Sequence, residues 1–127
     1  IVKISDEELG FITGENSIKA TLPKLFTGNV KLVIYTCGSE GAYAFTKNAQ
    51  AFSKSEKVKA VDTTGAGDGF IGSFLYALKA LNVTAESLCD LDNAQLERCI
   101  AFSNKFCGES VKHQGAIDSY RKIDFVY

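Results

Sequence analysis

The sequence has little proline, little histidine and no long hydrophobic segment. Its 127 residues include one Pro, one His, no Met and no Trp. No apolar run approaches the roughly 20 residues that a membrane-spanning helix needs, so the sequence predicts no membrane partner. An excess of one charge is also lacking, because 14 basic and 15 acidic residues give a net charge of −1. This balance removes any bulk electrostatic reason to expect nucleic acid as a partner.

Metal-binding and disulfide-forming cysteine patterns are absent as well. The four cysteines form no C-x-x-C pair, and the single His113 leaves no Cys/His spacing suited to zinc. Cys99 and Cys107 fall in an apolar helical pattern, where a free thiol behaves as a small core residue. Two disulfides are arithmetically possible, but nothing else in the sequence indicates secretion. We therefore expect reduced thiols and a cytoplasmic location.

What remains is the composition of one globular domain, with apolar residues at 46%, charged residues at 23% and aromatics at 11%. Continuous apolar runs predict buried strands at 1–4 and 31–36. The other expected elements are a helix from Ser5 to Gly14, a helical stretch over 16–26 broken or started at Pro23, a hairpin of 42–45 and 49–52, a strand at 58–61, helices over 70–81 and 93–107, and a strand at 123–127. This order predicts an α/β fold with a mainly parallel sheet. The apolar start without Met indicates a cut within a larger protein.

One short segment, Asp62 to Asp68 with the sequence DTTGAGD, indicates chemistry on its own. It separates a β-prone run from an amphipathic helix. The step Gly65-Ala66-Gly67 leaves no bulk over the first helical turn, so N–H groups at the helix N-terminus can approach an anion closely. The segment therefore predicts a phosphate site.

Asp68 indicates what happens to that phosphate. A carboxylate repels a bound phosphate, so a simple anion-binding loop rarely contains one. A phosphotransferase needs one, because a base must take the proton from the attacking hydroxyl while N–H groups stabilise the phosphoryl charge. The alternative is a glycine-rich turn in which Asp68 is only a capping residue.

Two common nucleotide-binding motifs are excluded. The run 67–72 matches G-x-G-x-x-G, but five residues separate Val61 from Gly67, and no strand precedes the acidic residues about 20 positions on. No G-x-x-x-x-G-K-[ST] motif occurs. We therefore reject a dinucleotide-binding unit and a P-loop.

The segment 62–68, followed by a small residue and Phe70, resembles the second signature of the ribokinase-like (PfkB) family of carbohydrate kinases. The run TCGSEG at 36–41 resembles the family's T-x-G-x-x-G turn, and KISDEE at 3–8 resembles its N-x-x-E element. Gly115-Ala116 matches the Gly-Ala pair after the last large helix. The strings IVKIS at 1–5, TTGAG at 63–67 and FLYAL at 74–78 look most like the fructokinase branch.

The resemblance implies a three-layer, Rossmann-like α/β/α fold of the ribokinase type, of which residues 1–127 form the ATP-binding C-terminal part. The implied activity is transfer of the γ-phosphoryl of Mg-ATP to a sugar hydroxyl, with fructose as the substrate and a homodimer as the full-length form. A kinase of ribose, adenosine or another sugar, a nucleotide-binding module without catalysis, and a purely structural domain remain alternatives. Without the N-terminal sugar-binding part and lid, we expect the chain alone to expose an apolar sheet edge and to be inactive.

The resemblance also implies roles for particular residues. Asp68 would be the base, and Gly65, Ala66 and Gly67 would form the anion hole. Thr36, Gly38 and Gly41 would contact nucleotide phosphates, Asn104 would lie near adenine, and Glu8 would organise magnesium through water. In members that bind potassium, the matching positions are Asp62, Thr64, Ser110, His113, Gly115 and Ser119. Two residues depart from the family pattern: Ser5 stands in place of Asn, and Gly69 in place of a more usual Ser, Thr or Ala.

Overall fold

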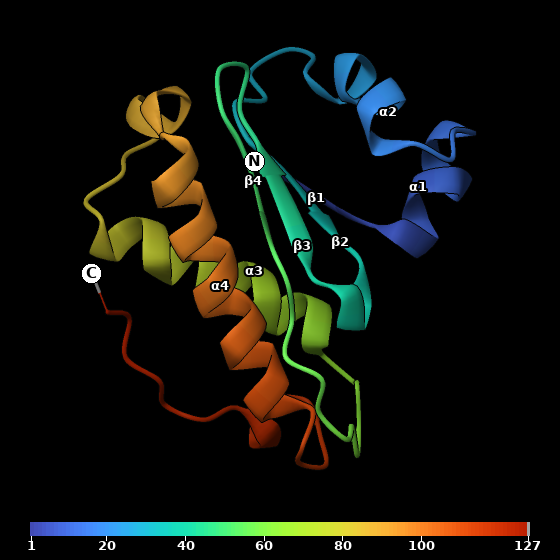
Figure 1. Cartoon of the computed structure of the whole chain (residues 1–127), viewed down its shortest axis with the longest axis vertical. Helices are drawn as coiled ribbons and strands as arrows, with labels where there is room; N and C mark the ends of the chain where they lie inside the picture. Colours follow the sequence, from blue (N-terminus) through green and yellow to red (C-terminus); the bar gives the residue numbers. More distant parts are fainter. Residues whose placement is uncertain (127) are drawn as a thin grey trace.

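The computed structural model describes residues 1–126, which form a four-stranded sheet with helices on both faces (Figure 1). The strands are β1 (Val2–Ser5), β2 (Val33–Thr36), β3 (Ala42–Phe45) and β4 (Gln50–Ser53). The helices are α1 (Asp6–Thr13), α2 (Ile18–Leu25), α3 (Ala66–Ala80) and α4 (Asn93–Ser110). Helices α1 and α2 lie on one side of the sheet and α3 and α4 on the other, which gives the expected α/β/α layers.

The sheet is mixed, and the expectation of a mainly parallel sheet is wrong. The strand order is β1-β2-β3-β4; β1 and β2 are parallel, whereas β2–β3 and β3–β4 are antiparallel. The reason lies in the connections. A parallel pair needs a crossover of about a dozen residues or more, which the segment containing α1 and α2 provides between β1 and β2. The short turns after β2 and β3 allow only antiparallel pairing.

Two further strand predictions are wrong. Residues 58–61 form no strand; Val61 is exposed, and its N–H donates to the Val111 carbonyl at 2.7 Å, so this segment connects to the end of α4 instead of joining the sheet. Residues 123–126 also form no strand; the tail packs on the helices, with the ring centroids of Phe125 and Phe102 5.4 Å apart. The last residue of that prediction, Tyr127, lies outside the described residues.

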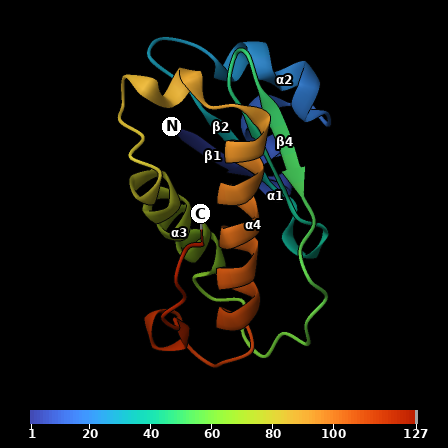
Figure 2. The same ribbon diagram turned by 60° about the vertical axis from the view of Figure 1, so that its left-hand side comes forward.

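The core lies between the sheet and the α3–α4 layer. Side chains alternate along a strand, so Ile34 and Ala44 point to the same face and pack with Phe74 and Ile100. Helix α4 packs against both α3 and β4 (Figure 2). Its N-terminus has a capping box in which Asp92 accepts from the Gln95 N–H at 2.8 Å. The core thus holds α4 in place relative to the sheet and α3.

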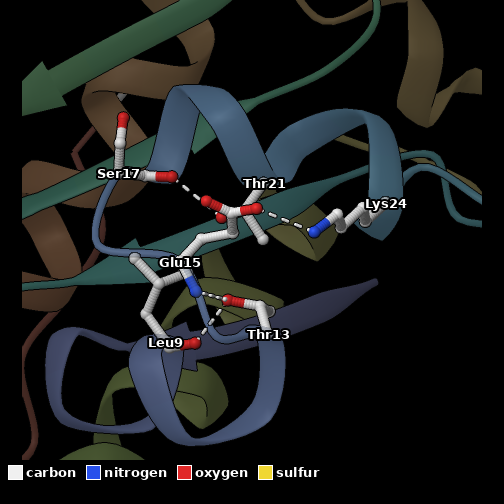
Figure 3. A network of polar contacts seen from close by, with 6 residues as sticks. All are labelled: Leu9, Thr13, Glu15, Ser17, Thr21 and Lys24. Atoms are coloured by element: carbon white, nitrogen blue, oxygen red, sulfur yellow. Dashed lines mark hydrogen bonds and ion pairs between the residues drawn. The ribbon is translucent and has the colours of Figure 1, made fainter.

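A polar network orders the connection between α1 and α2 (Figure 3). The Thr13 hydroxyl donates to the Leu9 carbonyl and accepts from the Glu15 N–H, and Lys24 forms an ion pair with Glu15 at 2.8 Å. Pro23 lies inside α2 and has no N–H to donate, so one helical hydrogen bond is missing there, and the helix ends at Leu25. The crossover between β1 and β2 therefore has a defined path.

All four cysteines are free, and burial raises the pKa of the Cys99 thiol to about 12, so this group is an unreactive part of the core. Within residues 1–126, none of the helices combines the length and the apolar character needed to cross a membrane.

Candidate active site

The carboxyl ends of the parallel strands meet the N-terminus of α3. Ser5 and Thr36 are partners at the ends of β1 and β2, the position where open α/β sheets bind ligands. Lys3 projects from β1 toward α3, and its Nζ lies 3.1 Å from the place that a Cβ on Gly67 would occupy. Three separate sequence motifs are thus brought to one place.

The first turn of α3 has the geometry of an anion site. Gly65 caps the helix in the left-handed conformation at φ 75°, which favours glycine. The Ala66 N–H donates to the Thr63 carbonyl at 3.1 Å. Within residues 1–126, no acceptor contacts the N–H of Gly67 or Asp68, so these two donors are available for an anion. The Asp68 side chain is exposed beside them.

Glu8 is held near this site by its own local contacts. It forms a capping box with Ser5, whose N–H donates to Glu8 Oε2 at 2.8 Å, while Lys3 Nζ lies 3.9 Å from the same oxygen. The Ser5 N–H, then the Ser5 hydroxyl and then Lys3 lower the pKa of Glu8. Ser5, which departs from the Asn of the family element, therefore acts as the helix cap, and Glu8 stays ionised near Lys3.

The predicted phosphate turn follows β2 and is linked to α4 by a hydrogen bond to the neighbouring end of β4. Gly41 has φ 123°, and a Cβ there would lie 2.3 Å from the Ser53 carbonyl oxygen. That oxygen accepts from Asn104 Nδ2 at 2.8 Å, so the amide nitrogen of Asn104 has a structural role at the turn. One helical turn later, the Cys107 thiol donates to the Ala66 carbonyl at 3.3 Å. Thr36 ends β2, and Gly38 begins the short 3-10 turn before Gly41.

The residues predicted for a monovalent cation converge below the α3 N-terminus. Asp62 accepts from the Thr64 N–H at 2.9 Å and from the Gly115 N–H at 3.0 Å. The buried hydroxyls of Ser110 and Ser119 lie 2.7 Å apart, and the His113 N–H donates to the Ser110 carbonyl. In the described part of the chain, no three His, Cys, Asp or Glu side chains form a metal-ligand group. A cation here would thus bind through the Asp62 carboxylate together with hydroxyl and carbonyl oxygens, which suit hard cations.

Asp62 makes the stability of this region depend on pH. Contacts with Thr64, followed by the Gly115 N–H, lower its pKa from 3.8 to about 2. A group whose pKa is lowered in the folded state stabilises the fold at pH values above its unfolded pKa. This stabilisation is lost as the pH falls. We expect the melting temperature of Asp62→Asn to lie below the native value by a constant amount above about pH 4, with the gap closing toward pH 2. A gap that stays unchanged down to pH 2 would contradict this role.

Sequence reasoning missed two residues that contact the α3 N-terminus. Lys3 could have been found, because it alternates with the apolar Val2 and Ile4 on a strand and so projects to the opposite face. Tyr120, whose hydroxyl donates to the Gly65 carbonyl at 2.8 Å, is 55 positions from its partner and has no local pattern to reveal it.

Of the two cavities described next, the larger does not coincide with the candidate active site. A mainly apolar cavity of about 360 Å³ is lined by Asp68, Tyr76, Phe102 and Tyr120, among others. A larger one of about 630 Å³ lies near the N-terminus of α4, lined by residues 48–49 and 89–94, and contains none of the predicted site residues. The smaller cavity therefore adjoins the candidate active site, through Asp68.

Several known proteins are similar to this chain in sequence or in fold. Fructokinase-1 of Oryza sativa subsp. japonica is 34% identical over 120 residues, which cover 94% of this chain and 36% of the relative. The structure of fructokinase with bound ATP from Xylella fastidiosa matches with a TM-score of 0.83 and 26% identity, covering 94% of this chain and 38% of that one. A fructokinase double mutant from Vibrio cholerae O395, in a form with fructose, ADP and potassium ion, matches with a TM-score of 0.78 and 32% identity, covering 93% of this chain and 36% of that one.

The chain spans about a third of the length of the curated relatives it matches. The sequence profile of the pfkB family carbohydrate kinases matches residues 1–123. This match extends over nearly all of the chain, including every motif described above. The chain therefore belongs to the pfkB family of carbohydrate kinases.

Proposed function

We propose that this chain is the ATP-binding part of a sugar kinase in which Asp68 is the base and the α3 N-terminus is the anion hole. The observation that carries the proposal is the pair of free N–H groups on Gly67 and Asp68, next to the Asp68 carboxylate and close to the Lys3 ammonium. Donors for a phosphoryl group and an acceptor for a proton thus occupy one helical turn, as in-line phosphoryl transfer requires.

Each group then has a role in the transfer. The Asp68 carboxylate takes the proton from the sugar hydroxyl as its oxygen attacks the γ-phosphorus. The bond from that phosphorus to the β–γ bridging oxygen breaks, and ADP leaves with the electron pair. The free N–H groups and Lys3 oppose the negative charge that develops. Mg²⁺, when bound, would supply positive charge to the phosphates, and Glu8, kept ionised, would orient its waters.

The nucleotide is proposed to lie along the turn after β2, with Thr36, Gly38 and Gly41 at its phosphates and Asn104 on the adenine side. The neighbouring oxygen-rich set around Asp62 and Ser110 is proposed to hold a potassium ion. The relatives named above support both ligands, since one structure contains ATP and another contains ADP and potassium ion.

Fructose is the proposed acceptor, because the relatives named above are fructokinases. Ribose, adenosine and other sugars remain alternatives. A nucleotide-binding module without catalysis is the second candidate. A homodimer and a cytoplasmic location stay predictions.

Lys3 provides a direct test in the full-length protein. We expect ATP binding by calorimetry and phosphoryl transfer to fructose in a coupled assay. Lys3→Met removes an ammonium group beside the anion hole and should lower kcat/KM for ATP by about 10- to 100-fold, the worth of a hydrogen bond to a charged group. Lys19→Met is the matched control, because Lys19 is an exposed charge on α2, across the sheet from the site. It should leave ATP binding and kcat/KM for ATP unchanged.

The outcomes separate the candidates. Native protein that binds no ATP and transfers no phosphate would refute the proposal, and binding without transfer to any sugar would favour the module without catalysis. If Lys3→Met and Lys19→Met have equal effects, Lys3 has no part in the reaction.

A further inference from the structure

We infer that Tyr120 is a positioning residue, which sets the orientation of the anion hole through a hydrogen bond to its first glycine. The inference rests on the proposed function and adds a residue to that site. The phenol O–H donates to the Gly65 carbonyl at 2.8 Å, from a tail segment that is remote in sequence.

The Gly65 carbonyl is held from two directions. It accepts the Tyr120 hydroxyl at 2.8 Å and, as the first helical bond of α3, the Gly69 N–H at 2.8 Å. A peptide group is planar, so two donors on one oxygen restrict rotation of the whole Gly65–Ala66 unit. The free N–H groups of Gly67 and Asp68 follow directly, and their direction depends on that plane. Electrostatic catalysis depends on such donors being oriented before the reaction.

The Tyr120 ring is held just as closely as its hydroxyl. It packs against Phe106 with ring centroids 5.2 Å apart. A Cβ on Gly69 would lie 3.2 Å from both Phe106 Cε1 and Tyr120 Cε1, which is too close without movement of a ring. This contact explains why Gly69 stands where a Ser, Thr or Ala is more usual. Gly69 and Tyr120 therefore act as one structural unit beneath the anion hole.

The environment keeps the phenol protonated, as a donor must be. Burial first, and then the nearby Asp68 charge, raise the pKa of Tyr120. Tyr76 lines the same cavity, but its hydroxyl has no hydrogen-bond partner in the described residues and its side chain is half exposed. The two tyrosines thus form a matched pair that differs in the contact to Gly65.

The test compares Tyr120→Phe with Tyr76→Phe in the full-length protein. Each variant loses one hydroxyl from the same cavity. We expect Tyr120→Phe to lower kcat by about fivefold, the worth of one neutral hydrogen bond, with KM for ATP and sugar unchanged. The affinity for Mg-ADP with aluminium fluoride, a mimic of the transferring phosphoryl, should fall by the same factor while that for Mg-ADP alone does not. Tyr76→Phe should match the native protein in all of these values.

A second variant covers the case in which Tyr120→Phe changes folding. Gly69→Ala keeps the hydroxyl but pushes the ring aside, so it should lower kcat in the same way, and the double variant Gly69→Ala/Tyr120→Phe should show no added loss. Native kcat in Tyr120→Phe, or a rise in KM at constant kcat, would overturn the inference. Native protein that neither binds ATP nor transfers phosphate would instead refute the proposed function.

Discussion

Asp68→Asn in the full-length protein is expected to lower kcat by about 10²- to 10⁴-fold, the usual contribution of a positioned general base. Asn has the same size but cannot take the proton from the sugar hydroxyl. ATP binding should be kept, since the substitution also removes a negative charge next to the phosphates. Steady-state kinetics and ATP calorimetry on the same preparation measure both values.

Asp124→Asn is the control for the change in charge. Asp124 lines the same cavity as Asp68, and its side chain is exposed. We expect native turnover for this variant. Turnover close to native in Asp68→Asn would remove the base from the mechanism, whereas equal losses in both variants would indicate a general effect of charge.

Gly41→Ala is expected to destabilise the fold by about 2–4 kcal/mol, the range for backbone strain combined with a steric clash. The residue has φ 123°, and the new Cβ would lie 2.3 Å from the Ser53 carbonyl oxygen and 2.9 Å from Lys54 Cα. Neither backbone atom can move without shifting the end of β4. The free energy of unfolding from urea denaturation, compared between native and variant, measures this cost.

Gly38→Ala separates strain from clash. Gly38 also has a positive φ, 52°, but no atom lies within 4 Å of its Cβ position. Its substitution should therefore cost only about 1 kcal/mol, the conformational part alone. If the two variants are destabilised equally, the contact with Ser53 has no energetic weight.

Local patterns predicted the helices and the early strands of this fold well. Helices α3 and α4 lie where the apolar spacing indicates, because an amphipathic face depends only on neighbouring residues. The strands predicted at 58–61 and 123–127 failed for a different reason: a β-prone run becomes a strand only beside a free sheet edge, and sequence spacing does not show where such edges lie. The sheet is not mainly parallel because the short turns after β2 and β3 allow only antiparallel pairing, although the alternation of strands and helices favours a parallel sheet.

The candidate site likewise contains features that are local in sequence and contacts between distant segments. The segment Asp62–Asp68 and the pair Ser5–Glu8 are each local, so their residue types alone indicated an anion site and a capped helix. The contacts of Lys3 with the α3 N-terminus and of Tyr120 with Gly65 join distant parts of the chain. The Tyr120 contact depends on tertiary packing and could not be predicted from one sequence, whereas the alternation of Lys3 with Val2 and Ile4 predicts the face on which Lys3 lies but not its partner.

Helix α4 contacts both halves of the candidate site within a single turn. Asn104 holds the carbonyl beside Gly41, and Cys107 contacts the carbonyl of Ala66. The turn after β2 and the anion hole are therefore both attached to α4 by hydrogen bonds. Their separation should stay constant when α4 moves as a unit. Displacement of α4 would carry the two halves together, so affinity for nucleotide and rate of transfer should change in parallel among variants of the buried side chains beneath it, such as Ile100.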